Sequence, residues 1–380
     1  MGHAQRNAVT KPGDAKKVQV FDGLKEDLTS VRNEFHFRTP FLSDYLLPML
    51  KDQRDEPMMH LMLNMVEVMV PGVICVFAVN LLCLSPMVRH VTGLAHVLTT
   101  VVFFLERFML MMHYASHRSL FHNTHLNGIL VWCFAPFMGI PCGMYHVHHV
   151  IMHHIENNHD MDISATECYQ RDSLLSFAQY WFHFVVGSWI ELPMYCIKSR
   201  RWHHAKTVSA GLLTYVLGIS LMAKLVNFTA TMWVFVIPYF IVMSALSLGN
   251  YSQHIFVNPD NNLDNYHLTY SCIDHPINKT TFNDGYHVIH HANARLHWSE
   301  LPQHFLKTLD KHRDSGSLTF KGVHFFDVGV MVLSGQLRSL VEKHYVHLGS
   351  AESAPTVEEV ETKLRSWLRP VSATAAKKTK

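Results

Sequence analysis

Residues 92–117 read TGLAHVLTTVVFFLERFMLMMHYASH, an apolar stretch that ends in two histidines four positions apart. The apolar part, 92–112, has the roughly 20 residues that a helix needs to cross a bilayer core of about 30 Å. His113 and His117 follow at once, and residues i and i+4 of a helix lie on one face. The stretch therefore predicts a membrane span that presents two imidazoles just outside the hydrocarbon.

Other stretches have a similar length and apolar character. We expect four spans, at residues 66–85, 92–112, 208–226 and 230–248. Short turns near Pro86 and Asn227 join them into two hairpins, which then begin and end on the same side of the membrane. Two more apolar stretches are expected to lie at the membrane surface. Prolines and glycines interrupt 128–145, and a polar stripe runs along 174–196.

The fold class expected is an all-α integral membrane protein, in which a helical domain carrying the histidines caps the two hairpins. Basic residues are concentrated before the third span, at Lys198, Arg200, Arg201 and Lys206. Because basic loops stay in the cytosol, both termini and the loop 113–207 are predicted to be cytosolic. The domains expected are a cytosolic N-terminal segment (1–60), a transmembrane and histidine-rich domain (61–300) and a cytosolic helical tail (301–380).

Histidine is unusually frequent, at 30 of 380 residues, while 48% of the residues are hydrophobic and 16% are charged. The balance of 32 Lys and Arg against 30 Asp and Glu argues against a nucleic-acid partner. The histidines are dispersed in short clusters and do not form a tag. Since imidazole is the commonest protein ligand for several transition metals, the clusters predict a metal site.

Three more clusters follow the first along the chain. The second is YHVHHVIMHH (145–154), in which His149 and His153 would share a helix face and His154 would point about 100° away. The third contains His287, His290 and His291 after Gly285, which would permit a tight entry into the helix. In the fourth, Asn250 and His254 end the last span at the i, i+4 spacing.

Nine histidines are the predicted metal ligands. They are His113, His117, His149, His153, His154, His254, His287, His290 and His291. Nine nitrogen donors exceed one metal and favour two six-coordinate iron ions, although two zinc ions also remain open. Further candidates, as ligands or as partners of ligands, are Asn250, His146, His148, Glu106 and Asp284. For Glu106 the alternative is an interfacial charge beside Arg107.

The boxes at 113–117, 149–154 and 283–291, in this order and spacing, resemble those of the membrane-bound fatty acid desaturase superfamily over residues 90–300. Asn250-x-x-x-His254 is similar to the Asn and additional His of stearoyl-CoA desaturases. His146 and His148 depart from the second box. The resemblance implies a di-iron, O2-dependent desaturase acting on a lipid acyl chain.

A cytochrome b5 domain is often fused to such enzymes, but its His-Pro-Gly-Gly motif does not occur in this sequence. The expected electron donor is therefore a separate cytochrome b5-like protein or ferredoxin. KKTK at 377–380 resembles a dilysine retrieval signal of endoplasmic-reticulum membrane proteins. A hydroxylase on the same scaffold and, from a different class, a membrane metal transporter are the alternatives. Acyl-CoA, glycerolipid and sphingolipid enzymes share the boxes, so the substrate class stays open.

Overall fold

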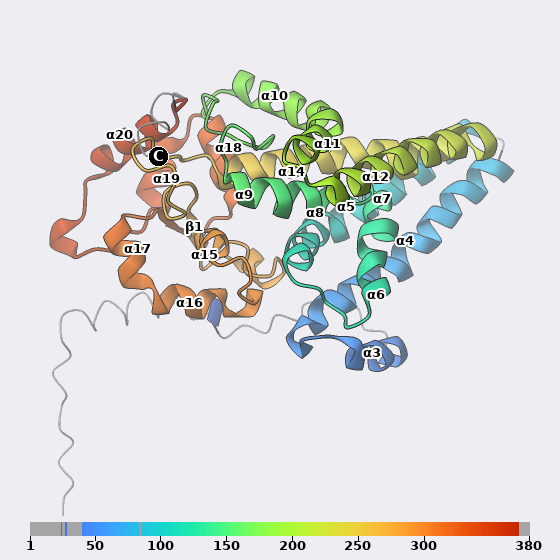
Figure 1. Ribbon diagram of the computed structural model, residues 1–380, viewed down its shortest axis with the longest axis horizontal. Helices are drawn as coiled ribbons and strands as arrows, with labels where there is room; N and C mark the ends of the chain where they lie inside the picture. Colours follow the sequence, from blue (N-terminus) through green and yellow to red (C-terminus); the bar gives the residue numbers. More distant parts are fainter. Residues whose placement is uncertain (1–23, 25–26, 29–39, 84, 372–380) are drawn as a thin grey trace, which may run out of the picture.

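The computed structural model describes residues 24, 27–28, 40–83 and 85–371. The chain is mostly helical, with long helices extending to one side of a compact part that contains the histidine clusters (Figure 1). Short helices α3 (Pro40–Leu46), η1 (Leu47–Met49) and η2 (Gln53–Asp55) precede the first long helix. The KKTK sequence at the C-terminus lies outside the described residues.

Four helical stretches are long and apolar enough to cross a membrane, as predicted: Gln53–Leu82, Pro86–His117, Trp202–Val226 and Phe228–Gln253. The first two are η2 with α4 (Glu56–Leu82), and α5 (Pro86–His117). The last two are α12 (Trp202–Leu221) with η6 (Met222–Val226), and α13 (Phe228–Thr231) with η7 (Met232–Val236) and α14 (Ile237–Gln253). They are longer than the apolar stretches in the sequence because the helices continue beyond them; α5, for example, runs on through His117.

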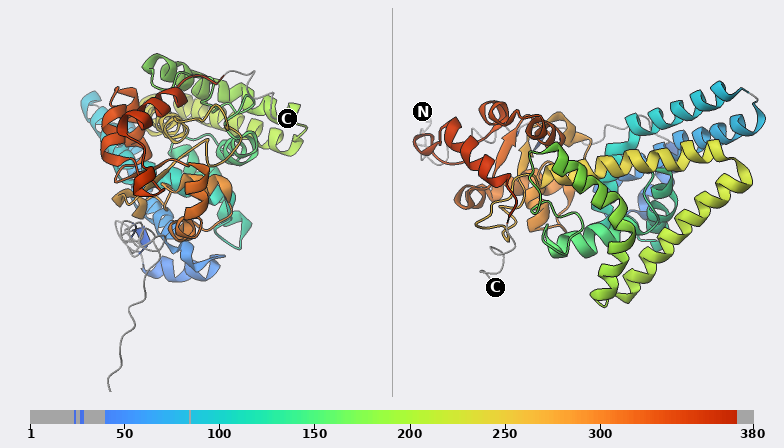
Figure 2. Two further views of the ribbon diagram at one scale, coloured as in Figure 1. Left: turned by 90° about the vertical axis from the view of Figure 1, so that its left-hand side faces the viewer. Right: turned by 90° about the horizontal axis from the view of Figure 1, so that it is seen from above.

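The two pairs of long helices touch where each pair turns, at the end remote from the histidines (Figure 2). Asn227 Nδ2 donates a hydrogen bond to the carbonyl of Asn80 at 3.3 Å. Gly93 permits a close approach of the pairs, because a Cβ there would lie 2.2 Å from Cγ of Trp233. Both turns therefore lie at the same end of the molecule.

Large apolar side chains face outward along these helices. Ile74 is 61% exposed, Leu82 83% and Val102 74%. Apolar surface of this extent is unfavourable in water and marks a surface that another apolar phase covers. The long helices are therefore suited to lipid contact.

The two apolar stretches that were assigned to the membrane surface form short helices outside the four candidate spans. The first contains α6 (Thr124–Ile129), η3 (Leu130–Phe134), α7 (Ala135–Phe137) and the start of α8 (Met144–His146). The second contains α10 (Leu174–Phe182), η5 (His183–Gly187) and α11 (Ser188–Lys198). Leu175, Phe182 and Ile190 are 61–71% exposed, whereas Tyr180 and Leu192 are fully buried, so this segment is amphipathic.

A small sheet departs from the all-α expectation. Strand β1 (Ser271–Ile273) pairs in parallel with β2 (Thr319–Lys321), with Cys272 opposite Phe320. Each strand has three residues, too few for an alternating pattern to be visible in the sequence. Their pairing depends on packing between distant segments.

The C-terminal segment packs into the rest of the protein. Its elements are α16 (Leu301–Lys307), α17 (Leu309–Ser315), β2, α18 (Phe325–Leu333), α19 (Leu337–His344), η10 (Ala351–Ser353) and α20 (Val357–Trp367). Leu340 and Leu364 are fully buried in one hydrophobic cluster with Tyr180 of α10 and Tyr251 of α14. Residues beyond 300 thus share a core with the helices that carry the histidines.

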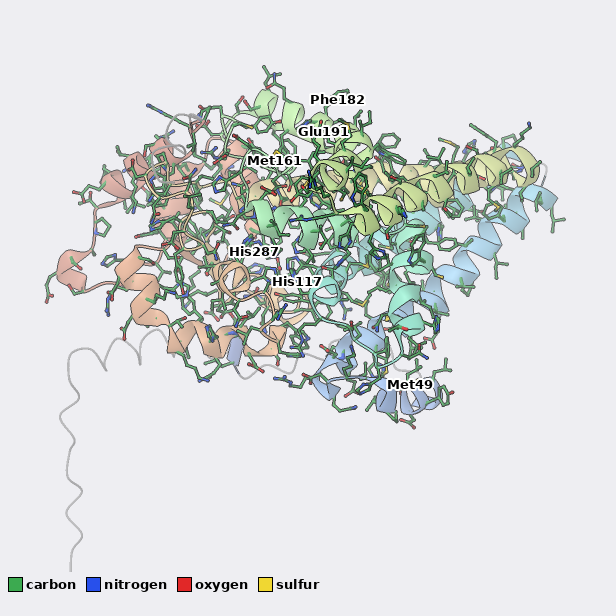
Figure 3. The ribbon with its side chains drawn as sticks, viewed as in Figure 1. Met49, His117, Met161, Phe182, Glu191 and His287 are labelled. Carbon is green, nitrogen blue, oxygen red and sulfur yellow. The ribbon has the colours of Figure 1, made fainter. Side chains whose placement is uncertain are left out.

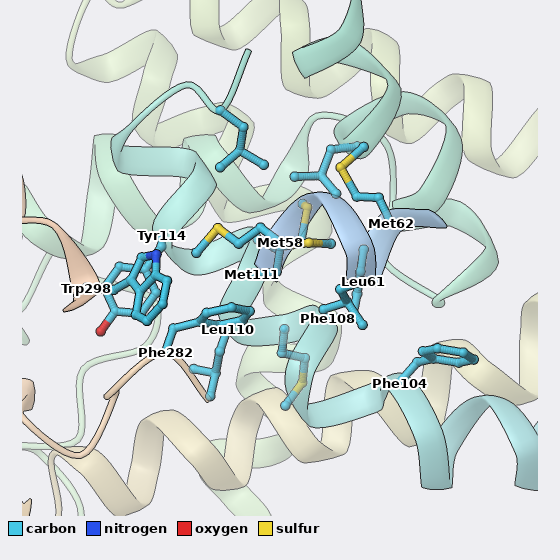
Figure 4. Close-up of a cluster of buried hydrophobic side chains, with 14 of the residues drawn as sticks. Met58, Leu61, Met62, Phe104, Phe108, Leu110, Met111, Tyr114, Phe282 and Trp298 are labelled. Atoms are coloured by element: carbon cyan, nitrogen blue, oxygen red, sulfur yellow. The ribbon is translucent and has the colours of Figure 1, made fainter. Parts of the chain in front are cut away.

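A second hydrophobic cluster joins α4 and α5 to the loop before the third histidine box (Figure 4). Met58, Phe104 and Phe108 are buried there beside Phe282 and Trp298. Burial of a side chain of this size contributes roughly 1.5–3 kcal/mol. The cluster therefore fixes the end of α5 against the third box.

Candidate metal centre

The first histidine box is the last turn of α5. His113 and His117 lie one turn apart on this helix, with ring centres 5.7 Å apart. His113 is buried, and Ser116 Oγ donates to its carbonyl at 2.6 Å. In Figure 3, His117 and His287 lie in the middle of the molecule, where the long helices meet the C-terminal part. The helical spacing predicted for this box is confirmed.

The second box is not the regular α-helix that its spacing suggested. The π-helix η4 (Val147–His153) runs into α9 (His154–Glu156). In it, the N–H of His154 donates to the carbonyl of His149, five residues earlier. The wider turn brings Nε2 of His149 to 3.2 Å from Nε2 of His154. The expectation that His154 diverges from His149 is therefore wrong, and His153 points to a different group.

The third box is α15 (His287–Ala292), as predicted. Gly285 is required here for a close approach. A Cβ at Gly285 would lie 2.2 Å from the carbonyl oxygen of Cys272 in β1. The tight entry that was expected of Gly285 is instead made by Phe282 and Asn283, both in the left-handed region with φ of 55° and 58°.

Two buried groups of imidazoles result from these boxes. The first group is His113, His117, His149 and His290, and the second is His153, His254 and His291. Within each group, one ring nitrogen per residue lies within 4.8 Å of the others. The four boxes, far apart in the sequence, are thus brought together.

The remaining two of the nine histidines border these groups. His154 Nε2 lies 3.0 Å from Nε2 of His290 and belongs beside the first group. The ring centre of His287 lies 4.8 Å from His291 and 5.6 Å from His254, which places it beside the second group. All nine predicted residues therefore lie in or next to two sites.

Hydrogen bonds orient the rings of the second group. His153 Nδ1 lies 2.6 Å from the buried carboxylate of Asp162. His254 Nδ1 donates to the carbonyl of Leu268 at 3.0 Å, and His291 Nδ1 lies 3.3 Å from Asn157 Oδ1. When Nδ1 carries the proton, the lone pair on Nε2 is free to bind a metal.

Burial keeps these imidazoles neutral. Desolvation, reinforced by neighbouring imidazoles, lowers the pKa of His149, His154, His254, His290 and His291 well below its usual value. Neutral imidazole is the form that binds metals. The sites therefore hold the required protonation state in advance.

Unpaired ring nitrogens test whether metal ions fit. Nε2 of His117, His254, His287 and His291 is buried without a hydrogen-bond partner in the described part of the chain. An unsatisfied buried polar atom costs about 1–3 kcal/mol. A metal ion at each group would bind these lone pairs, so the residues fit two metals with mainly nitrogen ligands.

The other candidates differ in their placement. Asp284 is fully buried, with Oδ1 at 3.8 Å from His287 Nδ1 and 4.0 Å from His113 Nε2. Asn250 Nδ2 donates to the carbonyl of Ser164 and to Tyr180 Oη, so Asn250 holds the loop of the second box in place. Asp284 is therefore the carboxylate closest to both groups among these candidates.

The two surplus histidines of the second box lie outside both groups. His146 Nδ1 is 3.2 Å from the carbonyl of Ser116, and its ring faces His204. His148 packs against Phe184, with its ring 6.3 Å from that of His153. Glu106 lies about two turns before His113 on α5. Its Oε1 is 3.7 Å from His324 Nδ1.

An apolar cavity leads to the histidine groups. Its apolar lining includes Met109, Ile140, Met144, Phe184 and Leu246. Its polar lining includes His113, His149, His153, His287 and Asn250. An apolar chain in this cavity would lie directly against the proposed metals.

Sequence reasoning missed several residues that support the site. Asn157 and Asn158 both have positive φ, 55° and 68°, and asparagine tolerates this conformation well. Their turn aims Asn157 at His291, and Asn158 Oδ1 accepts from Thr166 N at 2.7 Å. The Asn-Asn pair directly after the second box was the available signal. No sequence signal marked Arg171, whose side chain donates to main-chain carbonyls of distant segments.

The fatty acid desaturase family model matches residues 89–318, more than half of the chain and including all four boxes. The chain belongs to the fatty acid desaturase family. Family membership implies an oxidoreductase that acts on lipid acyl chains, in agreement with the histidine groups and the apolar cavity. Neither a curated protein nor a solved structure matches the chain.

Proposed function

We propose that the protein is an O2-dependent desaturase that introduces a double bond into a lipid acyl chain at a di-iron centre. The observation that carries the proposal is the pair of buried histidine groups at the side of an apolar cavity. Two groups of imidazoles suit two metal ions. An apolar cavity beside them suits an apolar substrate and keeps water from the reaction.

The nine histidines are the proposed ligands. His113, His117, His149, His154 and His290 would bind one iron ion, and His153, His254, His287 and His291 the other. When bound, the two ions supply the activation of O2 and the removal of hydrogen from an unactivated C–H bond.

The chain itself provides positioning and exclusion of water. The cavity lining binds the acyl chain and keeps water from the reacting carbons. Asp162 and the carbonyl of Leu268 fix the direction of their imidazoles. Asp284, near both groups, is proposed as a ligand or as the acceptor of a hydrogen bond from a ligand.

The proposed location is the endoplasmic-reticulum membrane, with both termini and the histidine groups on the cytosolic side. Both turns between long helices lie at the end remote from the histidines, and the basic residues near Arg200 lie before the third span. Electrons would come from a separate cytochrome b5-like protein or ferredoxin on the cytosolic side.

Expression in yeast together with cytochrome b5, followed by lipid profiling, tests this function. We expect new double bonds with the wild type and with His183→Ala, whose 42%-exposed side chain lies outside both groups. His254→Ala should abolish them. Hydroxylated lipids without new double bonds would instead identify a hydroxylase. No lipid product, with zinc retained by His254→Ala, would identify a metal-binding membrane protein.

A further inference from the structure

A second, more exposed cavity adjoins the one beside the histidines. The two share Glu106, Met109, Ala245 and Phe326 in their linings. Side-chain exposure rises outward, from 4% for His113 to 30% for Glu106 and 55% for Asp327. The second cavity is therefore the entrance to the first.

Four polar side chains line this entrance, and we refer to them as the mouth: Glu106, His275, His324 and Asp327. His324 Nδ1 lies 3.7 Å from Glu106 Oε1, and His275 Nε2 lies 4.0 Å from Asp327 Oδ2. The backbone N–H of His324 donates to Asp327 at 2.9 Å at the start of α18. The mouth thus combines carboxylates with imidazoles on three segments.

Two atoms of the mouth lack partners. Glu106 Oε1 and His324 Nε2 are buried without a hydrogen bond within the described ranges. Burial lowers the pKa of His324 to about 3, so its ring is neutral at physiological pH. The site therefore offers hydrogen-bond acceptors, and His324 adds no positive charge to it.

Basic residues are missing from the linings. Among the described residues, neither cavity is lined by Lys or Arg. Lys321 on the neighbouring strand is engaged by Asp274 at 3.1 Å. Phosphate recognition normally uses Arg or Lys, and like charges placed together oppose binding. The mouth, lined by acidic side chains and without Lys or Arg, therefore offers the phosphates of an acyl-CoA no favourable partner.

The mouth is bordered by surface suited to lipid. Val102 and Phe103 precede it on α5 and are 74% and 44% exposed. Val330, one turn after Asp327 on α18, is 54% exposed. A substrate can therefore reach the mouth from the bilayer, with its acyl chain already in an apolar phase.

We propose that the mouth binds the head of a membrane lipid whose uncharged hydroxyl and amide N–H groups donate hydrogen bonds to Glu106 and Asp327. The acyl chain of this lipid then extends into the cavity beside the histidines. This assignment rests on the proposed desaturase function and adds the chemical class of the substrate. A hydroxyl donor occurs in ceramides and monoacylglycerols, whereas the amide donor occurs only in the former.

Binding of three C18 probes to the purified full-length protein in detergent tests the proposal: N-stearoylsphinganine, 1-monostearoylglycerol and stearoyl-CoA. We expect the uncharged lipids to bind about tenfold more tightly than stearoyl-CoA, a difference of about 1.4 kcal/mol. Tighter binding of the ceramide than of the monoacylglycerol would add the amide to the recognised donors. Equal binding of the two uncharged lipids would contradict the amide contact of the proposal. Equal or tighter binding of stearoyl-CoA would overturn the proposal without the need for any variant.

The double variant Glu106→Gln/Asp327→Asn provides the second arm. Because charge-assisted hydrogen bonds are about twice as strong as neutral ones, it should lose about tenfold in ceramide affinity while stearoyl-CoA affinity stays equal or rises. Asp260→Asn, in an exposed turn, is the matched control. Ceramide affinity equal to that of the control, with unchanged metal content and melting temperature, contradicts the proposal.

Product formation separates this inference from the function on which it rests. Desaturation without the expected lipid preference overturns only the proposed recognition of the lipid head by the mouth. The expected lipid preference in a protein that binds iron, receives electrons and makes no oxidised lipid overturns the desaturase proposal.

Discussion

Arg171 tests how the C-terminal segment supports the second histidine group. Its side chain is fully buried and donates to six main-chain carbonyls at 2.7–3.1 Å. These belong to Thr166, Glu167, Tyr169, Ile255, Trp367 and Arg369. Ile255 follows His254 directly, and Thr166 Oγ1 donates to the carbonyl of His254 at 2.6 Å. One guanidinium thus ties the end of α20 to the loop of the second box.

The variant Arg171→Lys keeps the charge and removes the planar fork. The carbonyls of Thr166, Glu167 and Trp367 also accept backbone N–H groups. Those of Tyr169, Ile255 and Arg369 are bound by three different nitrogens of Arg171. Lysine has a single nitrogen, which cannot occupy all three positions, so one or two of these carbonyls lose their partner. Each buried carbonyl left unpaired costs about 1–3 kcal/mol, which gives roughly 1–6 kcal/mol before relaxation. Whole domains are stable by only about 5–15 kcal/mol. We expect the melting temperature to fall by about 1–7 °C, since the entropy of unfolding of 380 residues is about 0.8 kcal/mol/K.

Thermal unfolding of the purified protein, with metal content measured in parallel, is the assay. Arg369→Lys is the matched control, because this side chain is exposed and lies in the same segment. Arg171→Lys should also release metal from the group of His153, His254 and His291 more readily. Melting of Arg171→Lys within about 1 °C of the control, a difference below about 0.8 kcal/mol, would refute the reasoning.

Two further predictions concern single side chains. Asp162→Asn should weaken metal binding about 10–100-fold, because it removes the carboxylate that orients His153; titration with ferrous iron measures this, and Asp160→Asn should change little. His312 is fully buried, and burial lowers its pKa to about 4. Its unfolded form, with a pKa of about 6.5, takes up a proton first as the pH falls, so stability should decrease between pH 6.5 and about 4. Between these pH values, the free energy of unfolding of His312→Phe should fall by up to about 3 kcal/mol less than that of the wild type, since one pKa unit is about 1.4 kcal/mol. Chemical unfolding at several pH values measures this, and a pH dependence equal to that of the wild type would contradict it.

The long helices could be predicted from the sequence because a bilayer leaves few alternatives to an apolar helix of about 20 residues. The first and third boxes could be predicted as well, since His113 with His117, and His287 with His290 and His291, adopt helical spacing. Their convergence followed from chain order, because two of the boxes end membrane spans.

The second box could not be predicted from its spacing. A π-helix has no reliable sequence signature, and in this structure it decides that His149 joins His154 while His153 joins His254. The supporting contacts of Arg171 were also hidden, because they are made to main-chain carbonyls from distant segments. Such contacts depend on the packed fold and not on the identity of the accepting residues.

The metal content of the purified protein tests the central claim most directly. Elemental analysis of protein produced with iron available should give about two iron ions per chain, since nine imidazoles suit two six-coordinate ions. His117→Ala and His254→Ala, one from each group, should each lower this number, while His183→Ala should not. Zinc in place of iron, or an iron content unaffected by both His117→Ala and His254→Ala, would contradict the account.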